Sequence, residues 1–153
     1  LLVVRIYYLL KQITMEVLNL ISSLARSILK IVATLKPLSI YVMGLFYVSV
    51  GYKHFQDPEW FIQIVPPILP FKLTLVYLSG LFEILLGILL MVPAFQSIAA
   101  RGLIILLICV YPANIYLALT NGTAMNTSPE IAWGRLPFQF VFLGLAYWHS
   151  KDQ

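Results

Sequence analysis

Residues Leu73–Val92 form an apolar run of twenty residues with one carboxylate, Glu83, near its centre. As a helix, such a run spans about 30 Å of hydrocarbon. An acidic residue halfway along a membrane helix costs roughly 2.5–3.5 kcal/mol on insertion scales, so it usually faces the protein interior and has a partner. The run therefore predicts a membrane helix, and any chemistry of this chain is expected near Glu83.

The composition agrees with a membrane protein. Hydrophobic residues make up 61% of the chain and charged residues 10%, whereas soluble domains average about 25% charged residues. The 153 residues fit one compact bundle. The basic residues behind the net charge of +4 are scattered, so no nucleic-acid partner is predicted. Cys109 is alone, which excludes an intrachain disulfide and a cysteine metal site.

Four spans are expected. Pro37 suits the first turn of the first one, because its missing N–H has no helical partner there. The fourth lies between two tryptophans, is short at about 24 Å, and needs a thin bilayer or help from Arg135 and His149 at its ends. The predicted fold is all-α: an integral membrane four-helix bundle over residues 37–153, with an additional N-terminal amphipathic helix over residues 1–36. The spans are Pro37–Phe55, Leu73–Val92, Ile98–Leu119 and Trp133–Trp148.

The segment Gln12–Lys36 differs from the spans. Its polar residues recur every three or four positions and so form one narrow stripe on a helix that is otherwise apolar. This pattern indicates a helix that lies along the membrane surface or docks on a partner subunit, or else a longer first helix of the bundle. The stripe consists of Gln12, Glu16, Asn19, Ser23, Arg26, Lys30 and Thr34. Because the sequence begins with leucine, we expect that its start was removed or lies outside it.

Basic residues predict the orientation. With four spans, one side of the membrane carries seven lysines and arginines and the other carries three, namely Lys53, Lys72 and Arg135. The positive-inside rule then places both termini inside, in the cytoplasm or an organelle interior. A bacterial inner membrane and the mitochondrial inner membrane both fit. The seven are Arg5, Lys11, Arg26, Lys30, Lys36, Arg101 and Lys151.

The two outer loops differ in character. Gln56–Phe71 is rich in proline and aromatic residues, and we expect a short helix capped by Asp57 with Pro58 at its first position. A bent proline segment follows, and the whole loop resembles a lid over the outer end of the bundle. Thr120–Ala132 is expected to be a polar loop.

Small and polar residues share helix faces. Ser79, Gly80, Glu83 and Gly87 lie on one face of the second span, where small residues let another helix approach closely. This pattern predicts that Glu83 points at a helix rather than at lipid. A second such face, on the first span, consists of Gly44, Tyr47, Gly51 and His54.

Five polar residues are therefore expected in an intramembrane cluster that opens outward: His54, Glu83, Asn114, Arg135 and Gln139. Two interpretations stand side by side. Either these groups pair to hold the helices together, with Glu83 bound to Arg135, or they line a pocket for a quinone head, a proton or a small polar molecule. No metal site and no catalytic residues are predicted, since the second histidine, His149, lies at the inner side and no Ser-His-Asp or Cys-His set is present.

Several motifs occur in order along the chain: His54-Phe55, Val65-Pro66-Pro67, Leu69-Pro70, Ser79-Gly80 with Glu83, and Tyr111-Pro112-Ala113-Asn114. Together they resemble the DoxX-like family of small four-helix membrane proteins. The resemblance covers about residues 51–148, and it implies the four-helix fold. By similarity, His54, Glu83, Asn114, Arg135 and Gln139 are polar positions of the family type.

The resemblance also bears on function, because relatives include subunits of membrane oxidoreductase assemblies. We expect an accessory subunit of a larger membrane complex, of a respiratory or other electron-transfer kind, without catalytic activity or a cofactor of its own. The extra amphipathic helix, the lack of a cofactor-ligand set and the short fourth span all suit a chain that packs against neighbouring subunits. Membrane lipids and other membrane-protein subunits are the expected partners, the latter along Gln12–Lys36. The alternative is a protein that works alone and binds a quinone or small solute near Glu83.

Overall fold

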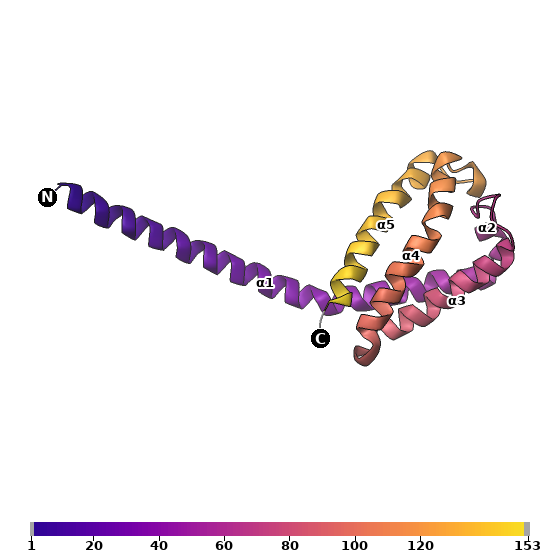
Figure 1. The fold of residues 1–153 in the computed structure, drawn as a ribbon, viewed down its shortest axis with the longest axis horizontal. Helices are drawn as coiled ribbons and strands as arrows, with labels where there is room; N and C mark the ends of the chain where they lie inside the picture. Colours follow the sequence, from indigo (N-terminus) through magenta and orange to yellow (C-terminus); the bar gives the residue numbers. More distant parts are fainter. Residues whose placement is uncertain (1, 152–153) are drawn as a thin grey trace. The chain divides into compact units, whose positions relative to one another are not determined.

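The structure is a computed structural model that describes residues 2–151. These residues form helices joined by turns and contain no strand, in agreement with the all-α fold class. They form two compact units, residues 2–38 and residues 39 onward, which are described separately. The elements are α1 (Leu2–Gln56), α2 (Pro58–Ile62), α3 (Lys72–Leu90), η1 (Pro93–Phe95), α4 (Gln96–Leu119), η2 (Thr123–Met125) and α5 (Pro129–Ser150), as labelled in Figure 1.

Helix α1 continues through Pro37, so the prediction that Pro37 opens a new helix is wrong. A proline inside a helix removes one hydrogen bond, here the one to the carbonyl group four residues earlier, at Ala33. Helix formation is cooperative, and α1 extends for many residues on both sides of Pro37. One missing bond therefore does not end α1.

The start of the proline-rich loop agrees with its prediction. Pro58 begins α2, and the Asp57 carboxylate accepts a hydrogen bond of 3.3 Å from the backbone N–H of Trp60. Phe61, Ile64 and Val65 are buried, whereas Ile68 and Phe71 remain exposed. The first half of the loop thus packs onto the helices, and its second half does not.

Helix α5 begins four residues earlier than the expected span, at Pro129. The hydroxyl group of Ser128 caps it by accepting a hydrogen bond from the N–H of Ile131, and Pro129 suits the first position. The end of the expected loop Thr120–Ala132 is therefore helical. The 22 residues of α5 extend over about 33 Å, so the helix is not too short for a bilayer.

Three helical segments of the described chain are long and apolar enough to cross a membrane: Val4–Gln56, Lys72–Leu90 and Pro93–Leu119. Helix α5 is long enough but is not among them. Glu130, Arg135 and Gln139 interrupt its apolar residues.

In the second unit, α4 packs against both α3 and α5. The core between the helices contains several alanines, at positions 99, 100 and 146, together with Leu90 and Leu103. At the end where α4 turns into α5, Ile64 packs on Leu117, Met125 and Ala132. Figure 1 shows α2 beside this turn. The loop after α1 therefore covers one end of the unit, as expected of a lid.

At the opposite end of the unit, polar contacts join α5 to α1 and to α4. His149 is fully buried, and its Nε2 atom lies 3.1 Å from the hydroxyl oxygen of Ser39. The Ser97 hydroxyl donates a 2.9 Å hydrogen bond to the carbonyl oxygen of Ser150. We expected His149 to support a short span at its end, but its ring instead packs inside, because the last turn of α5 faces the other helices.

Four glycines set the distance between α1 and α3 in this unit. A Cβ atom added to Gly51 would lie 2.6 Å from the carbonyl oxygen of Gly80, and one added to Gly44 would lie 2.8 Å from that of Gly87. Both pairs of residue numbers add to 131, so these segments run antiparallel. The predicted small-residue faces of the two helices are therefore the faces that meet.

We expect Gly80→Ala to lower the free energy of unfolding by roughly 1–3 kcal/mol, as overpacked substitutions do. The new Cβ atom would lie 2.5 Å from the Cβ atom of His54, and both atoms are held by helix backbone. Thermal unfolding in detergent, followed by circular dichroism, measures the effect.

The matched control is Gly134→Ala in α5, where an added Cβ atom meets nothing within 4 Å. Alanine is favoured over glycine in a helix by about 1 kcal/mol, so this variant should be as stable as the unmodified protein or more so. Equal stability of the two variants would contradict the close packing of α1 on α3.

Candidate functional site

His54 and Glu83 meet where α1 packs on α3. Both are buried, and the Nδ1 atom of His54 lies 3.3 Å from an oxygen of the Glu83 carboxylate. The same Nδ1 atom lies 3.0 Å from the carbonyl oxygen of Val50. Because a carbonyl group only accepts, Nδ1 carries the hydrogen and donates it there. The contact with Glu83 is therefore a close approach rather than a hydrogen bond.

Phe61 covers this pair. Its ring stacks on the imidazole ring of His54, with the ring centres 3.6 Å apart and the planes 22° from parallel. Phe61 belongs to α2, so the lid segment contacts the histidine directly. Glu83 itself is 7% exposed, which confirms that its side chain faces another helix.

Tyr47 is a third buried polar residue on the same side of α1, two turns before His54. Its ring packs edge-on against Phe142 of α5, and its hydroxyl group lies within the electrostatic field of Glu83. In the described chain, neither the Tyr47 hydroxyl oxygen nor the Glu83 Oε2 atom has a hydrogen-bond partner. Buried polar atoms rarely lack partners, so these two need an explanation. The sequence placed Tyr47 on this helix face but did not single it out as a site residue.

A separate network joins α4 to α5. The Nε atom of Arg135 donates to the side-chain oxygen of Asn114 over 3.1 Å, and the amide nitrogen of Asn114 donates to Gln139 over 2.6 Å. Gln139 in turn donates to the carbonyl oxygen of Leu107. The side-chain amides of both Asn114 and Gln139 are therefore hydrogen-bonded, and the network stabilises the contact between α4 and α5.

The five predicted residues thus fall into two groups. Arg135 is close enough to Glu83 and His54 for electrostatic interaction, but the described residues contain no ion pair between Arg135 and Glu83. The direct pairing of one of the two interpretations is therefore not seen among the described residues: Asn114 holds the guanidinium group of Arg135, while Glu83 lies on the small-residue face of α3 that packs on α1.

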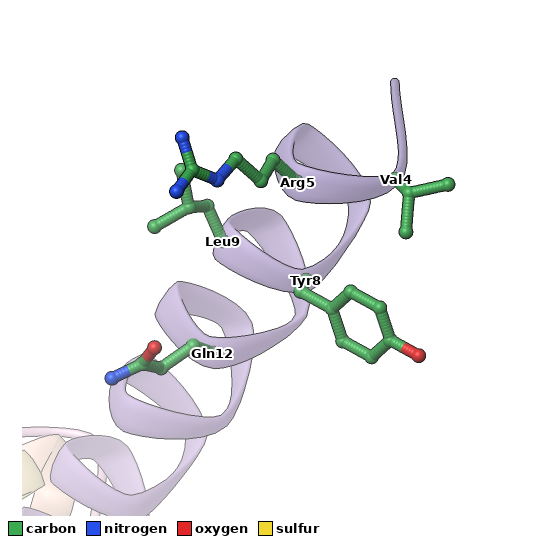
Figure 2. Close-up of a pocket in the computed structure, with 5 residues that line it drawn as sticks. All are labelled: Val4, Arg5, Tyr8, Leu9 and Gln12. Atoms are coloured by element: carbon green, nitrogen blue, oxygen red, sulfur yellow. The ribbon is translucent and has the colours of Figure 1, made fainter. Parts of the chain in front are cut away.

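Surface hollows occur elsewhere, on the first unit. One is lined by Val4, Arg5, Tyr8, Leu9 and Gln12 (Figure 2), and the other by Ser27, Lys30, Ile31, Thr34 and Leu35. Each is lined by successive turns of one helix, so each is a groove between side chains and not an enclosed site. Among the residues that the structure describes, no three histidine, cysteine or acidic residues gather in a metal-binding group.

Comparison with known families gives one match. Residues 43–150 fit the model of a family described as a domain of unknown function (DUF8561). The chain belongs to this family. No curated protein and no solved structure matches the chain. The DUF8561 region contains Tyr47, all five predicted site residues and the four glycines between α1 and α3, whereas the stripe on Gln12–Lys36 lies outside it.

We expect Gln139→Ala to destabilise the DUF8561 region by roughly 1–3 kcal/mol, since it leaves the Asn114 amide and the Leu107 carbonyl without their partner. The matched control is Gln63→Ala, because Gln63 is exposed and the change should cost less than about 0.5 kcal/mol. Denaturant unfolding in detergent compares them. Similar losses in both variants would mean that the network does not stabilise the fold.

Proposed function

We propose that this chain is an integral membrane protein and an accessory or structural subunit of a larger membrane complex. In this proposal, residues 39–151 form the membrane-embedded four-helix bundle. The complex is of a respiratory or other electron-transfer kind, as the resemblance to DoxX-like proteins implies. The chain has no catalytic activity or cofactor of its own.

The membrane setting is supported by the outer surface of the helices. Helix α4 is apolar on all sides, so part of its apolar surface faces outward. On this surface, Ile98, Ile105 and Ile108 are each at least 60% exposed. Soluble monomers rarely expose contiguous apolar surface of this kind, and lipid would cover it. The three long apolar segments of α1, α3 and α4 point the same way.

The observation that carries the subunit proposal is the helix of residues 2–38. Its 37 residues extend over about 55 Å, well beyond the roughly 30 Å of a bilayer core. This unit consists of one helix, so it contains no second element to cover its apolar side chains, and they are exposed along its whole length. Lipid and a neighbouring subunit are the partners that such a helix requires.

The polar residues of the second unit favour a structural role as well. The side-chain amides of Asn114 and Gln139 are hydrogen-bonded within the protein, and the surface hollows are lined by residues of the first unit. Amide groups that are bonded internally have little free capacity to hold a ligand. The network therefore supports helix assembly rather than binding.

A second candidate function rests on Tyr47 and Glu83. Their buried oxygens without hydrogen-bond partners are atoms to which a quinone, a proton or a small polar solute would bind. In this alternative the protein works alone, and the lid residue Phe61 closes the site over His54.

The proposed orientation rests on the charge count and the helix order. The antiparallel contact of α1 with α3 and the short η1 turn into α4 are compatible with successive helices that cross the membrane in alternating directions. We therefore keep both termini on the inner side, in a bacterial inner membrane or an organelle membrane such as the mitochondrial inner membrane.

The native mass of the protein after gentle detergent extraction, measured together with its absorption spectrum, tests the main proposal. We expect a large particle that carries the bands of a redox cofactor such as haem or flavin. A colourless monomer or small oligomer would contradict an electron-transfer subunit and would favour the second candidate.

Glu83→Gln separates the two candidates. Because Glu83 Oε2 accepts no hydrogen bond in the described chain, we expect the variant to assemble into the same particle. The electron-transfer activity of that particle should be unchanged. Normal assembly with loss of activity would support a binding site at Glu83. Loss of assembly would show that the contact with His54 holds α1 and α3 together.

A further inference from the structure

The polar stripe on the first unit forms a straight row along the helix. Its residues are spaced alternately by four and three positions from Gln12 to Arg26, and all are exposed. This 3.5-residue repeat keeps a row in line over several helical turns. Figure 2 shows Arg5 and Gln12, two turns apart, on the same side of the helix, so the row extends toward the N-terminus.

The row is symmetric in sequence. The numbers of three residue pairs add to the same value, 42: Gln12 with Lys30, Glu16 with Arg26, and Asn19 with Ser23. Two helices that run in opposite directions bring together residues whose numbers have a constant sum. We propose that residues 12–30 form an antiparallel helix pair with the same segment of a second copy of this chain.

Charge complementarity favours this partner and this direction. In the antiparallel register, Glu16 of each copy faces Arg26 of the other, and the symmetry gives two such ion pairs. Asn19 faces the hydroxyl group of Ser23, and the Gln12 side-chain oxygen accepts from the ammonium group of Lys30. A parallel pair in register would instead set Glu16 against Glu16 and Arg26 against Arg26, which repel.

The side chains are available for these contacts. In the described chain, Gln12 and Glu16 form a hydrogen bond of 3.4 Å with each other, which leaves the second oxygen of Glu16 free to accept. Within the same residues, the side chains of Asn19, Arg26 and Lys30 form no ion pair or hydrogen bond, and all three are exposed. Polar contacts between helices in or at a membrane contribute to their association.

The pairing also fits the proposed membrane setting, on which this step rests. Two copies with the same orientation in a membrane can be related only by a two-fold axis along the membrane normal. Helices related by that axis are antiparallel only when they lie in the membrane plane, so the proposal also requires α1 to bend at Pro37, where the helix lacks one backbone hydrogen bond. The apolar remainder of the helix would then lie at the boundary of the acyl chains, as in interfacial helices.

Disulfide crosslinking of the full-length chain in membranes tests the pairing. Cys109, the single and exposed cysteine, is first replaced by alanine. Copies that carry Gln12→Cys are then mixed with copies that carry Lys30→Cys and oxidised. We expect a mixed disulfide dimer, because a disulfide needs Cα atoms within about 7 Å and the register sets these positions opposite each other.

Two controls make the result specific. Gln12→Cys alone should not crosslink to itself, since positions 12 and 30 are 18 residues, about 27 Å, apart along the helix. The pair Val17→Cys and Ala25→Cys also adds to 42 but lies on the opposite side of the helix, and it should not crosslink. A self-crosslink at position 12, or crosslinking at 17 with 25 as efficient as at 12 with 30, would overturn the proposal.

Charge reversal gives an independent readout. Energy transfer between labelled full-length copies in phosphatidylcholine vesicles measures the dissociation constant of the dimer. We expect Glu16→Arg and Arg26→Glu each to weaken the dimer at least tenfold, and the double variant to return to within threefold of the original. Unchanged affinity in both single variants, or no rescue in the double variant, would overturn the antiparallel pair.

These outcomes are distinguishable from failure of the proposed function. A colourless particle of small mass removes the electron-transfer subunit but leaves the dimer intact. Absence of the 12–30 crosslink within a large pigmented particle removes the dimer and leaves the subunit proposal, with another protein as the partner of the stripe.

Discussion

The close approach of α1 to α3 determines the position of most other groups in the second unit. Gly44, Gly51, Gly80 and Gly87 let two helix backbones pack at a distance that any larger side chain would prevent. His54 lies against Gly80, and Glu83 lies one turn further along the same face. The buried contact between histidine and carboxylate therefore follows from the absence of four side chains. Tyr47 lies on the same face of α1 and is buried, with its ring against Phe142 of α5.

The two clusters of polar residues in this unit differ in how many of their side chains have hydrogen-bond partners. Arg135, Asn114 and Gln139 pass hydrogen bonds from one to the next and end on a backbone carbonyl group, so helices α4 and α5 gain a specific register. Between α1 and α3, a tyrosine hydroxyl and a carboxylate oxygen have no such partners in the described chain. The first group stabilises the packing of α4 on α5. The second contains the oxygen atoms to which a small molecule or a proton would bind. Both groups lie within the DUF8561 region, so the family match does not distinguish their roles.

Sequence patterns predicted the helices well where a single rule decided them. The cap at Asp57, the end of α4 at Leu119 and the inward direction of Glu83 are confirmed. The sequence failed where two rules compete. Pro37 is compatible with both a helix start and a helix interior, and cooperativity decided for the interior. The start of α5 was missed because Ser128-Pro129-Glu130 resembles a polar loop until its capping role is recognised.

The sequence by itself determined the all-helical class, the apolar segments long enough to cross a membrane and the faces on which small and polar residues gather, since these depend on neighbours three or four residues apart. Only the tertiary structure decided which polar side chains meet. Asn114 and Arg135, 21 residues apart, come together, as do His54 and Glu83, while the expected pair of Glu83 and Arg135 does not form within the described chain. Pairing across helices depends on their rotation and separation, which are set by packing between distant segments rather than by local spacing.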